Sequence, residues 1–327
     1  MPKIRFACNL YDRMQPLYTG EVKPEGVDFE FVAVESARNI FDRMAGSQEF
    51  DASEFSSSEF LARMSAGKCP FVAIPVFPSR TFRHSFIWIN AKSGIKSPKD
   101  LAGRRIGVPL YTMTAAIWIR GHLQRDFGVD LSGVKWVQGA INDAGAHGEP
   151  SVMPLLKPVA IEQNTTGKSL SQLLDEGKID ALLGTNHPDS RKHNPDIRRL
   201  FPDFKEVEKD YYRRTGVFPI MHIVAIRKEV YEKNPAVAKS LYEACCHSKA
   251  IASKRMRYLG APRYMLPWMG ADIEEADQVF GEEWWPYGAE RNRATMETLI
   301  GYLHDQAVID RKFRLEDVFV DVKSDLQ

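Results

Sequence analysis

The chain has 327 residues, with 44 Lys and Arg against 43 Asp and Glu, a formal net charge of +1, and 44% hydrophobic residues. This ordinary globular mixture argues against a disordered, collagen-like or coiled-coil protein, and a chain of this length usually divides into about two domains. The balanced charge lacks the strongly basic footprint that a nucleic-acid-binding domain normally shows.

Short apolar strands alternate with amphipathic helices along the whole chain, which favours an α/β fold over an all-α or all-β fold. The predicted elements are, in chain order, a strand at 4–8, a helix at 36–45, strands at 50–52 and 105–108, a helix from Thr114, a helix at 169–176, strands at 179–183 and 220–227, and helices at about 234–258 and 290–305.

One supersecondary unit occurs twice. A helix, a glycine and a strand containing Phe-Asp-Ala or Ile-Asp-Ala span residues 36–52 and again 169–183. Ser169 and Gln172 at the start of the second helix have the spacing of a capping box. This weak internal repeat suggests two α/β lobes of similar construction.

The start of the chain does not look like an export signal. Arg5, Asn9, Asp12 and Arg13 interrupt the apolar run that a secretory signal needs, and no later stretch approaches the ~20 apolar residues of a membrane span. We therefore expect a cytoplasmic protein that does not associate with membranes. Its four cysteines include no C-x-x-C pair, which predicts reduced and mostly buried thiols.

Candidate binding residues gather where strands give way to helices, because ligands of open α/β sheets bind beyond the carboxyl ends of strands and near helix N-termini. The serines among them could instead be simple helix caps, and the arginines could pair with the protein's own carboxylates. Five segments carry the candidates: 9–13 with Tyr11 and Arg13; 54–59 with Glu54, Ser57 and Ser58; 78–85 with Arg80, Arg83 and His84; 110–114 with Tyr111, Thr112 and Thr114; and 184–188 with Asn186 and His187.

His222 is a further candidate. It stands between apolar residues at 220–224, a position typical of a buried core histidine, yet histidine is also the usual acid or base near neutral pH. The spacing of His187 and His193 fits no metal motif, so no metal site is predicted. The chain has no G-x-S-x-G, Walker A or G-x-G-x-x-G motif, which argues against serine hydrolases, P-loop enzymes and Rossmann dehydrogenases.

Together these segments resemble the 4,5-dihydroxyphthalate decarboxylase family. The resemblance covers essentially the whole chain, and its more specific parts are Arg-Thr-Phe-Arg-His-Ser and Tyr-Thr-Met-Thr. It is carried by FDASEFSSSEF at 50–60, PVFPSRTFRHS at 75–85, IGVPLYTMTAA at 106–116, EPSVMP at 149–154 and GVFPIMH at 216–222.

The resemblance implies a two-lobed α/β fold like that of type 2 periplasmic binding proteins, with two crossover connections and the ligand in an interlobe cleft. Lobe one is expected at residues 1–92 plus 218–327, and lobe two at 93–217. The five candidate segments would then line one cleft.

The family's activity implies decarboxylation of 4,5-dihydroxyphthalate to 3,4-dihydroxybenzoate (protocatechuate) and CO2 in bacterial phthalate degradation. Chemistry favours protonation of the ring carbon that bears the carboxylate, with a para hydroxyl supplying electrons. No organic cofactor is then needed, although a divalent metal chelated by the catechol stays open. Arg80 and Arg83 are the hypothetical carboxylate clamps, and His84 or His222 is the acid. Glu54 is a catalytic candidate beside them, and Glu54, Ser57, Tyr111 and Thr112 would hold the hydroxyls.

Two alternatives stay open at this point. The same fold commonly serves as a solute receptor for a membrane transporter, which would have to be exported. Another enzyme of the fold, such as a thiamine-pyrimidine synthase, would need a cysteine-rich or pyridoxal-binding site, which the sequence does not show. The expected partner is a small aromatic dicarboxylate, and a homo-oligomer is not excluded.

Overall fold

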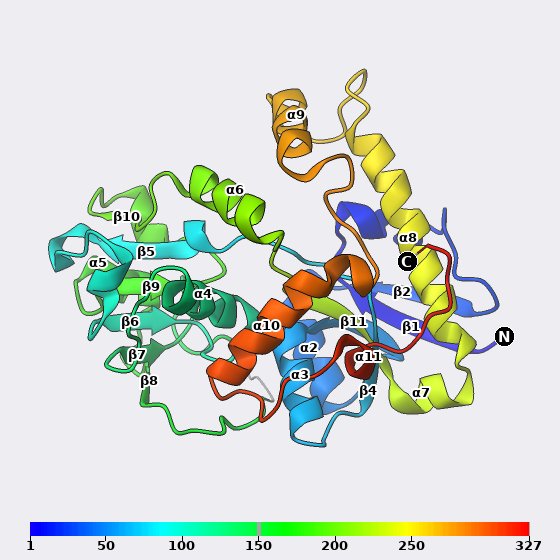
Figure 1. Ribbon diagram of the computed structural model, residues 1–327, viewed down its shortest axis with the longest axis horizontal. Coiled ribbons are helices and arrows are strands. Elements are labelled where there is room, and N and C mark those ends of the chain that lie inside the picture. The colour runs from blue at the N-terminus through cyan, green and yellow to red at the C-terminus, as the bar shows by residue number, and fades with distance from the viewer. Residues whose placement is uncertain (149–151, 327) are drawn as a thin grey trace.

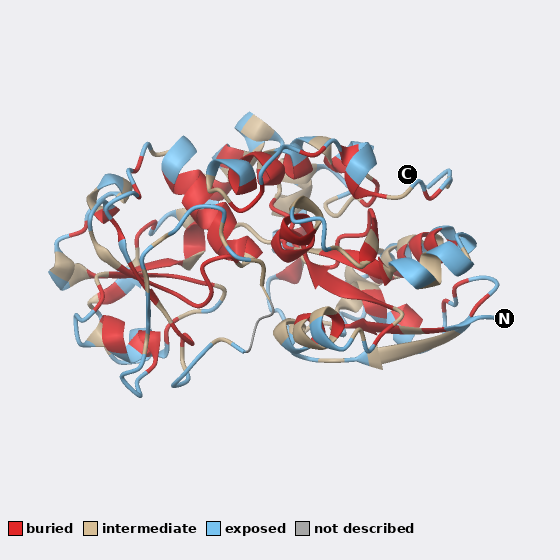
Figure 2. Cartoon of the chain, turned by 90° about the horizontal axis from the view of Figure 1, so that it is seen from below, coloured by how far each residue is buried: buried red, intermediate tan, exposed pale blue. Residues whose placement is uncertain are grey.

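The computed structural model describes residues 1–148 and 152–326. Two α/β lobes lie side by side along the long axis of the molecule, and each is built around its own β-sheet (Figure 1). Lobe one contains both chain termini. The sheets form the buried centre of each lobe, and most of the exposed residues lie on loops and outer helix faces (Figure 2). The predicted two-lobed α/β fold is confirmed.

Lobe one has a five-stranded sheet in the order β2-β1-β3-β11-β4. Strand β1 is parallel to β2 and β3, whereas β11 is antiparallel to β3 and β4. The chain thus leaves this sheet after β4 and returns to it much later as β11. The strands are β1 (Lys3–Cys8), β2 (Asp28–Ala33), β3 (Ala52–Ser56), β4 (Phe71–Ile74) and β11 (His222–Arg227).

Lobe two has a six-stranded sheet in the order β10-β5-β9-β6-β7-β8. Strands β9, β6, β7 and β8 run parallel, and β5 is antiparallel to both of its neighbours. The strands are β5 (Ile87–Asn90), β6 (Arg105–Val108), β7 (Lys135–Gln138), β8 (Ile161–Gln163), β9 (Ala181–Leu183) and β10 (Ile197–Arg199).

Helices cover both sheets, and their ends follow the sequence signals. The Ser36 side chain accepts a hydrogen bond from the Asn39 amide and caps α2, and the capping box of Ser169 and Gln172 opens α5 as predicted. The helices are α1 (Gln15–Tyr18), α2 (Ala37–Gly46), α3 (Ser57–Ser65), α4 (Thr114–Arg125), α5 (Leu170–Asp175), α6 (Phe204–Thr215), α7 (Lys228–Lys233), α8 (Ala236–Met256), α9 (Met269–Phe280), α10 (Arg293–Asp305) and α11 (Leu315–Val318).

Two predicted boundaries are wrong. Strand β5, at residues 87–90, pairs with β9 and β10, so it belongs to lobe two although lobe one was expected to extend to residue 92. The strand predicted at 50–52 begins at Ala52 and continues to Ser56. Strand β3 is buried on both faces between β1 and β11, so its polar residues do not alternate with apolar ones in the usual way. Glu54 therefore lies inside a strand rather than after it.

Helix α4 belongs to the cores of both lobes. Ala115, Ile117 and Trp118 pack in the core of lobe one, whereas Ala116, Ile119 and Leu123 pack in that of lobe two. The Trp118 Nε1–H also donates to the Ile220 carbonyl at 2.9 Å, just before β11. One helix thus ties the two lobes together from within.

Helix α10 strengthens this connection, because it crosses the centre of the molecule and packs on α4 (Figure 1). A Cβ atom at Gly121 would lie 2.0 Å from the Tyr302 ring, so only glycine permits this approach. Beyond the helix end, Gln306 Nε2 donates to the Ile117 carbonyl at 2.9 Å. Arg125 and Asp305 add an ion pair on the outside.

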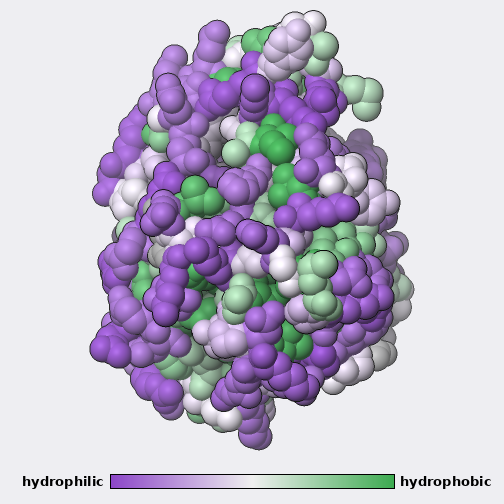
Figure 3. Space-filling model, turned by 90° about the vertical axis from the view of Figure 1, so that its right-hand side faces the viewer, coloured by the Kyte–Doolittle hydropathy of each residue, from purple (hydrophilic) through white to green (hydrophobic). Residues whose placement is uncertain are grey.

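The outer surface is mainly hydrophilic. Figure 3, which views the lobe-one end, shows scattered hydrophobic residues among predominantly polar ones. Within the part of the chain that the structure describes, no helix has both the length and the apolar content needed to cross a membrane.

Candidate active site

A pocket of about 460 Å³ lies between the lobes. Its wall combines polar and charged side chains with apolar ones. Lobe one and the first crossover contribute Glu35, Ser36, Ala37, Arg38, Phe41, Ser56, Glu59, Arg83, Met221 and His222, and lobe two contributes Met113, Thr114, Ala115, His147, Thr185 and Asn186. Of the sequence candidates, His222, Arg83, Thr114 and Asn186 thus meet at one pocket.

A hydroxyl network joins the lobes at the base of this pocket. Ser56 caps α3, and its Oγ lies 3.1 Å from the Thr114 Oγ1 at the first residue of α4. The Ser58 amide donates to that same Thr114 oxygen at 3.1 Å, and the Ser58 Oγ donates to the Thr112 carbonyl at 2.8 Å. The N-termini of two helices therefore converge here, which favours a negatively charged ligand.

Behind the pocket wall, His222 is hydrogen-bonded to a buried carboxylate. Strand β11 begins at His222, and its antiparallel register with β3 brings the imidazole beside Glu54. The distance from His222 Nδ1 to Glu54 Oε1 is 2.6 Å. The Tyr11 hydroxyl donates to the same oxygen at 2.6 Å, and the Asn9 amide donates to Oε2 at 3.1 Å.

These contacts decide the charge of Glu54. Complete burial acts to raise its pKa, but attraction to His222 and the hydrogen bonds from His222, Tyr11 and Asn9 outweigh that effect. The net result is a pKa below the usual value of 4.5, so Glu54 is ionised at neutral pH. Burial and the neighbouring Glu54 in turn raise the pKa of the Tyr11 hydroxyl, which stays protonated.

The arrangement orients His222 for proton transfer. Nδ1 faces Glu54, while Nε2 makes no hydrogen bond with any described residue. The edge of the ring meets the Phe41 ring at a centroid distance of 4.9 Å, which fixes its plane. The side chain remains 18% exposed at the pocket wall. Since Glu54 accepts the Nδ1 proton, Nε2 can exchange a proton with a ligand, as in other histidine–carboxylate pairs.

Two arginines place positive charge in the pocket. Arg83 is buried, and its Nε donates to the Met221 sulfur at 3.3 Å, with no ion pair to a carboxylate of the described residues. Burial lowers the pKa of Arg83 to about 10, so it remains charged at neutral pH. Arg38 is held by Glu59 at 2.5 Å and Asp42 at 2.6 Å. Arg83 is thus the more available cation for an anionic ligand.

Arg80 lies elsewhere, although it was expected beside Arg83. Its two terminal nitrogens donate to the carbonyls of Phe218 at 2.9 Å and Pro286 at 3.4 Å, and its guanidinium lies over the Phe218 ring. It does not line the pocket. Residue 80 forms a β-bridge with Ile220, whereas Arg83 lies beyond that bridge, directly before the helical turn at His84–Phe86, so the two side chains point to different places.

His84 is also outside the pocket. It is buried and stacks on His122 at 4.7 Å, with Phe201 and Tyr211 around it. Burial, followed by the neighbouring His122 and Arg214, lowers the pKa of His84 to about 3. It is therefore neutral at physiological pH and packs as a core residue. Of the two histidines proposed as the acid, His84 and His222, only His222 therefore lines the pocket.

Glu208, whose Oε1 lies 3.8 Å from His84 Nδ1, should make the stability of the protein depend on pH. Burial raises its pKa from 4.5 to about 7, so the folded protein keeps this proton in a range where the unfolded chain has lost it. The resulting stability is fully present below pH 4.5 and is lost as the pH rises through 7. The difference in unfolding free energy between the wild type and Glu208→Gln should therefore decrease as the pH rises from 4.5 to 7. Urea denaturation across this range measures it, and a pH-independent difference would contradict it.

The remaining candidates support the site or lie apart from it. Tyr11 acts on Glu54, and Ser58 and Thr112 build the hydroxyl network. Ser57 is buried at the start of α3, and its amide donates to the Met221 carbonyl. The others make contacts away from the pocket: Arg13 with the Pro78 carbonyl and Asp12, Tyr111 under the Arg120 guanidinium, and His187 between Phe86 and Trp88.

Several pocket residues were not predicted, above all Arg38 and His147, whereas Glu59 belongs to the predicted segment 54–59 but was not singled out within it. Residues 35–38 follow β2 and open α2, so they have the same position as the five segments that were singled out. The same rule would have found Arg38. His147 and Thr185 reach the pocket from loops of lobe two and carry no such signal. No three His, Cys, Asp or Glu side chains of the described residues are grouped as a metal site.

The fold is shared with solute-binding proteins. The periplasmic aliphatic sulphonate-binding protein SsuA of Escherichia coli matches with a TM-score of 0.55 and 12% identity, over 98% of this chain and 92% of that chain. A Candida albicans gene product described as having the generic periplasmic-binding-protein fold matches with a TM-score of 0.50 and 13% identity, over 100% of both chains. At these identities the likeness concerns the fold alone.

Sequence relatives define the family. No protein-family model matches the chain. A 4,5-dihydroxyphthalate decarboxylase of Comamonas testosteroni is 34% identical over 319 residues, which are 97% of this chain and 96% of the relative. A second protein of that name, from Pseudomonas putida, is 37% identical over 211 residues, which are 64% of this chain and 81% of the relative. The chain therefore belongs to the 4,5-dihydroxyphthalate decarboxylase family of carboxy-lyases.

Proposed function

We propose that this protein decarboxylates 4,5-dihydroxyphthalate to 3,4-dihydroxybenzoate and CO2 in the pocket between its lobes. The observation that carries the proposal is the His222–Glu54 pair, with a 2.6 Å hydrogen bond, in the same pocket as Arg83. Family membership supplies the reaction class and the substrate of the named relatives.

The substrate's chemistry explains why an acid is needed. The electron pair of a departing aryl carboxylate lies in the ring plane and cannot delocalise, so direct loss of CO2 is slow. Protonation of the ring carbon that bears the carboxylate makes this carbon tetrahedral. The para hydroxyl releases its proton, and the ring becomes a dienone. The C–C bond then breaks, its electron pair restores the aromatic ring, CO2 leaves, and the phenolate oxygen regains a proton.

His222 is the proposed acid. Nε2 donates the proton to the ring carbon, and Glu54 stabilises the imidazolium before the transfer because it is a buried, ionised partner of Nδ1. A proton from water restores the imidazolium after each turnover. Tyr11 and Asn9 keep the Glu54 carboxylate in place through their hydrogen bonds.

The cations and helix ends serve the carboxylates. We propose that Arg83 binds the carboxylate that remains in the product, because it is buried, charged and unpaired within the described residues. Arg38 and the N-termini of α3 and α4 would add positive potential around the dianion. Met113, Ala115, Met221 and Phe41 supply the apolar surface for the ring.

Turnover tests the proposal directly. Purified protein is incubated with 4,5-dihydroxyphthalate without added cofactor, and CO2 release and the aromatic product are measured. In D2O, the product should carry a deuterium at the carbon that lost the carboxylate. Phthalate, which lacks the para hydroxyl, should bind without releasing CO2. Saturable binding of the dihydroxy compound without turnover would refute the proposal and favour a solute-binding protein for aromatic acids. Loss of activity with a chelator would show that a metal takes part.

A further inference from the structure

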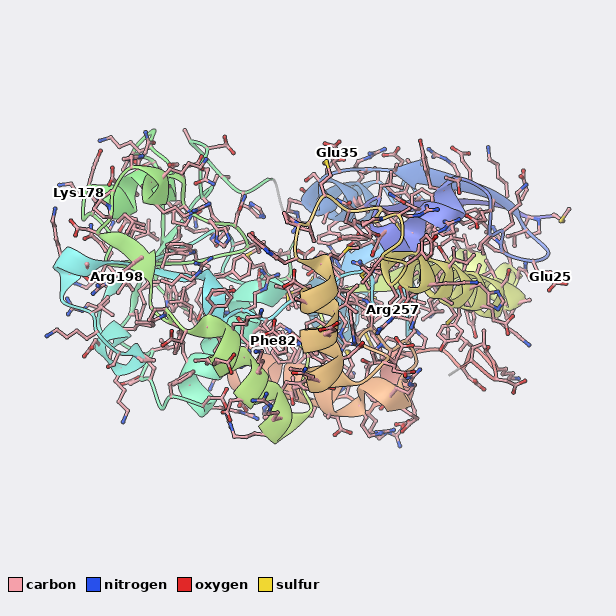
Figure 4. The ribbon with its side chains drawn as sticks, turned by 90° about the horizontal axis from the view of Figure 1, so that it is seen from above. Glu25, Glu35, Phe82, Lys178, Arg198 and Arg257 are labelled. Carbon is pink, nitrogen blue, oxygen red and sulfur yellow. The ribbon has the colours of Figure 1, made fainter. Side chains whose placement is uncertain are left out.

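A second large pocket, of about 580 Å³, lies at the outer edge of lobe two beside β10. Figure 4 shows that Arg198, on β10, lies far along the molecule from Glu35, which lines the interlobe pocket. We name this second pocket the basic groove. Its lining residues are Trp88, Ile89, Ile95, Lys96, Arg191, Ile197, Arg198, Arg199, Leu200 and Pro202.

The basic groove collects positive charge without a counter-charge. Lys96, Arg191, Arg198 and Arg199 line it, and no carboxylate does. Within the described residues none of these four forms an ion pair. Three nearby aspartates have other partners: Asp196 pairs with Lys92 at 2.9 Å, Asp189 with Lys192 at 2.5 Å, and Asp100 accepts from the amides of Lys96 and Ser97. Glu208 attracts Arg199 from outside the groove lining. Four cations in one pocket repel one another, and a bound anion would relieve that repulsion.

Two of the four cations, Arg199 and Arg191, lie over aromatic rings. The Arg199 guanidinium lies 4.8 Å from the Trp88 ring and 4.6 Å from the Phe204 ring, and its Nε donates to the Ser85 carbonyl at 3.2 Å. Arg191 lies 6.0 Å from the same Trp88 ring. Burial and then the nearby Arg191 lower the pKa of Arg199, as expected for guanidinium groups that face one another. Because these contacts fix Arg199, its side chain loses little entropy when a ligand binds.

The rest of the groove is apolar. Ile89, Ile95, Ile197 and Leu200 are buried beneath the charged rim. A pocket of several hundred Å³ with an apolar floor and a few charged groups has the size and composition of a small-molecule site.

We propose that the basic groove binds a small organic anion with at least two negative charges and an apolar body. Aromatic dicarboxylates and phosphorylated metabolites share this chemistry. The site is distinct from the interlobe pocket and independent of the proposed decarboxylation, because none of its residues lines that pocket.

A chain of contacts connects the two sites. Trp88 meets the His187 ring at 5.3 Å, and the His187 amide donates to the side chain of Asn186, which lines the interlobe pocket. Burial, together with Arg199 and Arg191, lowers the pKa of His187. An anion that neutralises these arginines should therefore raise the pKa of His187, which makes this histidine a reporter of occupancy.

Calorimetric titration with phenyl phosphate and with phthalate tests the proposal on the wild type, on the double variant Arg191→Ala/Arg198→Ala and on Lys192→Ala. Both arginines are exposed, so their removal should leave the fold intact, which thermal melts verify. Lys192 is an equally exposed cation outside the groove and serves as the matched control. The double variant should weaken binding roughly 10-fold or more, and the control should not change it.

Phthalate can also occupy the interlobe pocket, so Arg83→Lys separates the two sites. Groove binding should persist in Arg83→Lys and should raise the NMR-measured pKa of His187, whichever anion binds. The anion that binds with the lower Kd shows whether the groove prefers phosphorylated compounds or dicarboxylates. Equal affinity of the wild type and the double variant for both anions would overturn the proposal. Tighter binding of a short single-stranded oligonucleotide, lost in the double variant, would also overturn it in favour of a nucleic-acid surface.

Discussion

Replacing His222 with glutamine should lower kcat for 4,5-dihydroxyphthalate by about 10²–10⁴-fold, the usual contribution of general acid–base catalysis. Glutamine keeps a polar side chain beside Glu54 but cannot deliver a proton at neutral pH. KM should change little, because the carboxylates are bound by other residues. Steady-state kinetics and the deuterium content of the product in D2O measure the effect.

Two variants serve as controls for this prediction. Glu54→Gln should also lower kcat, because a neutral amide no longer stabilises the imidazolium at His222 Nδ1. His84→Asn should lower the melting temperature and leave kcat near the wild-type value, because His84 stacks on His122 away from the pocket. If His84→Asn abolished turnover in a folded protein while His222→Gln retained it, the assignment of the acid would be reversed.

Arg83→Lys should lower kcat/KM by roughly 10–150-fold, the loss expected when a charged hydrogen bond to a desolvated carboxylate is removed. Lysine keeps the positive charge but cannot form the paired hydrogen bonds that a guanidinium makes to a carboxylate. The effect should appear mainly in KM, since the carboxylate is bound before and during the reaction. Kinetics beside thermal melts separate this loss from unfolding.

Arg80→Lys is the matched comparison, because Arg80 is an equally buried arginine only three residues away. Its guanidinium bridges the carbonyls of Phe218 and Pro286, so its replacement should lower the melting temperature and leave the KM of the folded enzyme unchanged. Near-normal kcat/KM in Arg83→Lys, or a selective rise of KM in Arg80→Lys, would contradict the assignment of the carboxylate clamp to Arg83.

The contrast between these two arginines shows what the sequence could predict. Alternating apolar segments and helix caps predict the α/β lobes, and strands 105–108 and 179–183 lie close to where they were expected. Both arginines named in the segment at 78–85, Arg80 and Arg83, are buried. Which one faces the pocket depends on the β-bridge between Arg80 and Ile220, a contact between segments remote in sequence.

Pairing between distant segments also explains why the lobe boundary and the Glu54–His222 contact were not predicted. Strand β5 joins lobe two because it pairs with β9 and β10, and nothing within residues 87–90 themselves encodes these partners. Glu54 and His222 were each recognised as candidates, but only the antiparallel register of β3 and β11 brings them within 2.6 Å. His147 reaches the pocket from an irregular loop, for which no periodic pattern exists.

Helix α4, which is shared by both cores, bears on how the enzyme turns over. Swinging the lobes apart about a hinge would pull Tyr302 away from Gly121 and break the hydrogen bond from Gln306 to the Ile117 carbonyl. Both contacts join the lobes outside the pocket, so we propose that they hold the pocket walls in place before the substrate binds. We expect substrate to enter, and CO2 and the catechol product to leave, through local movements of rim residues such as Glu35 and His147, with the lobes themselves at rest.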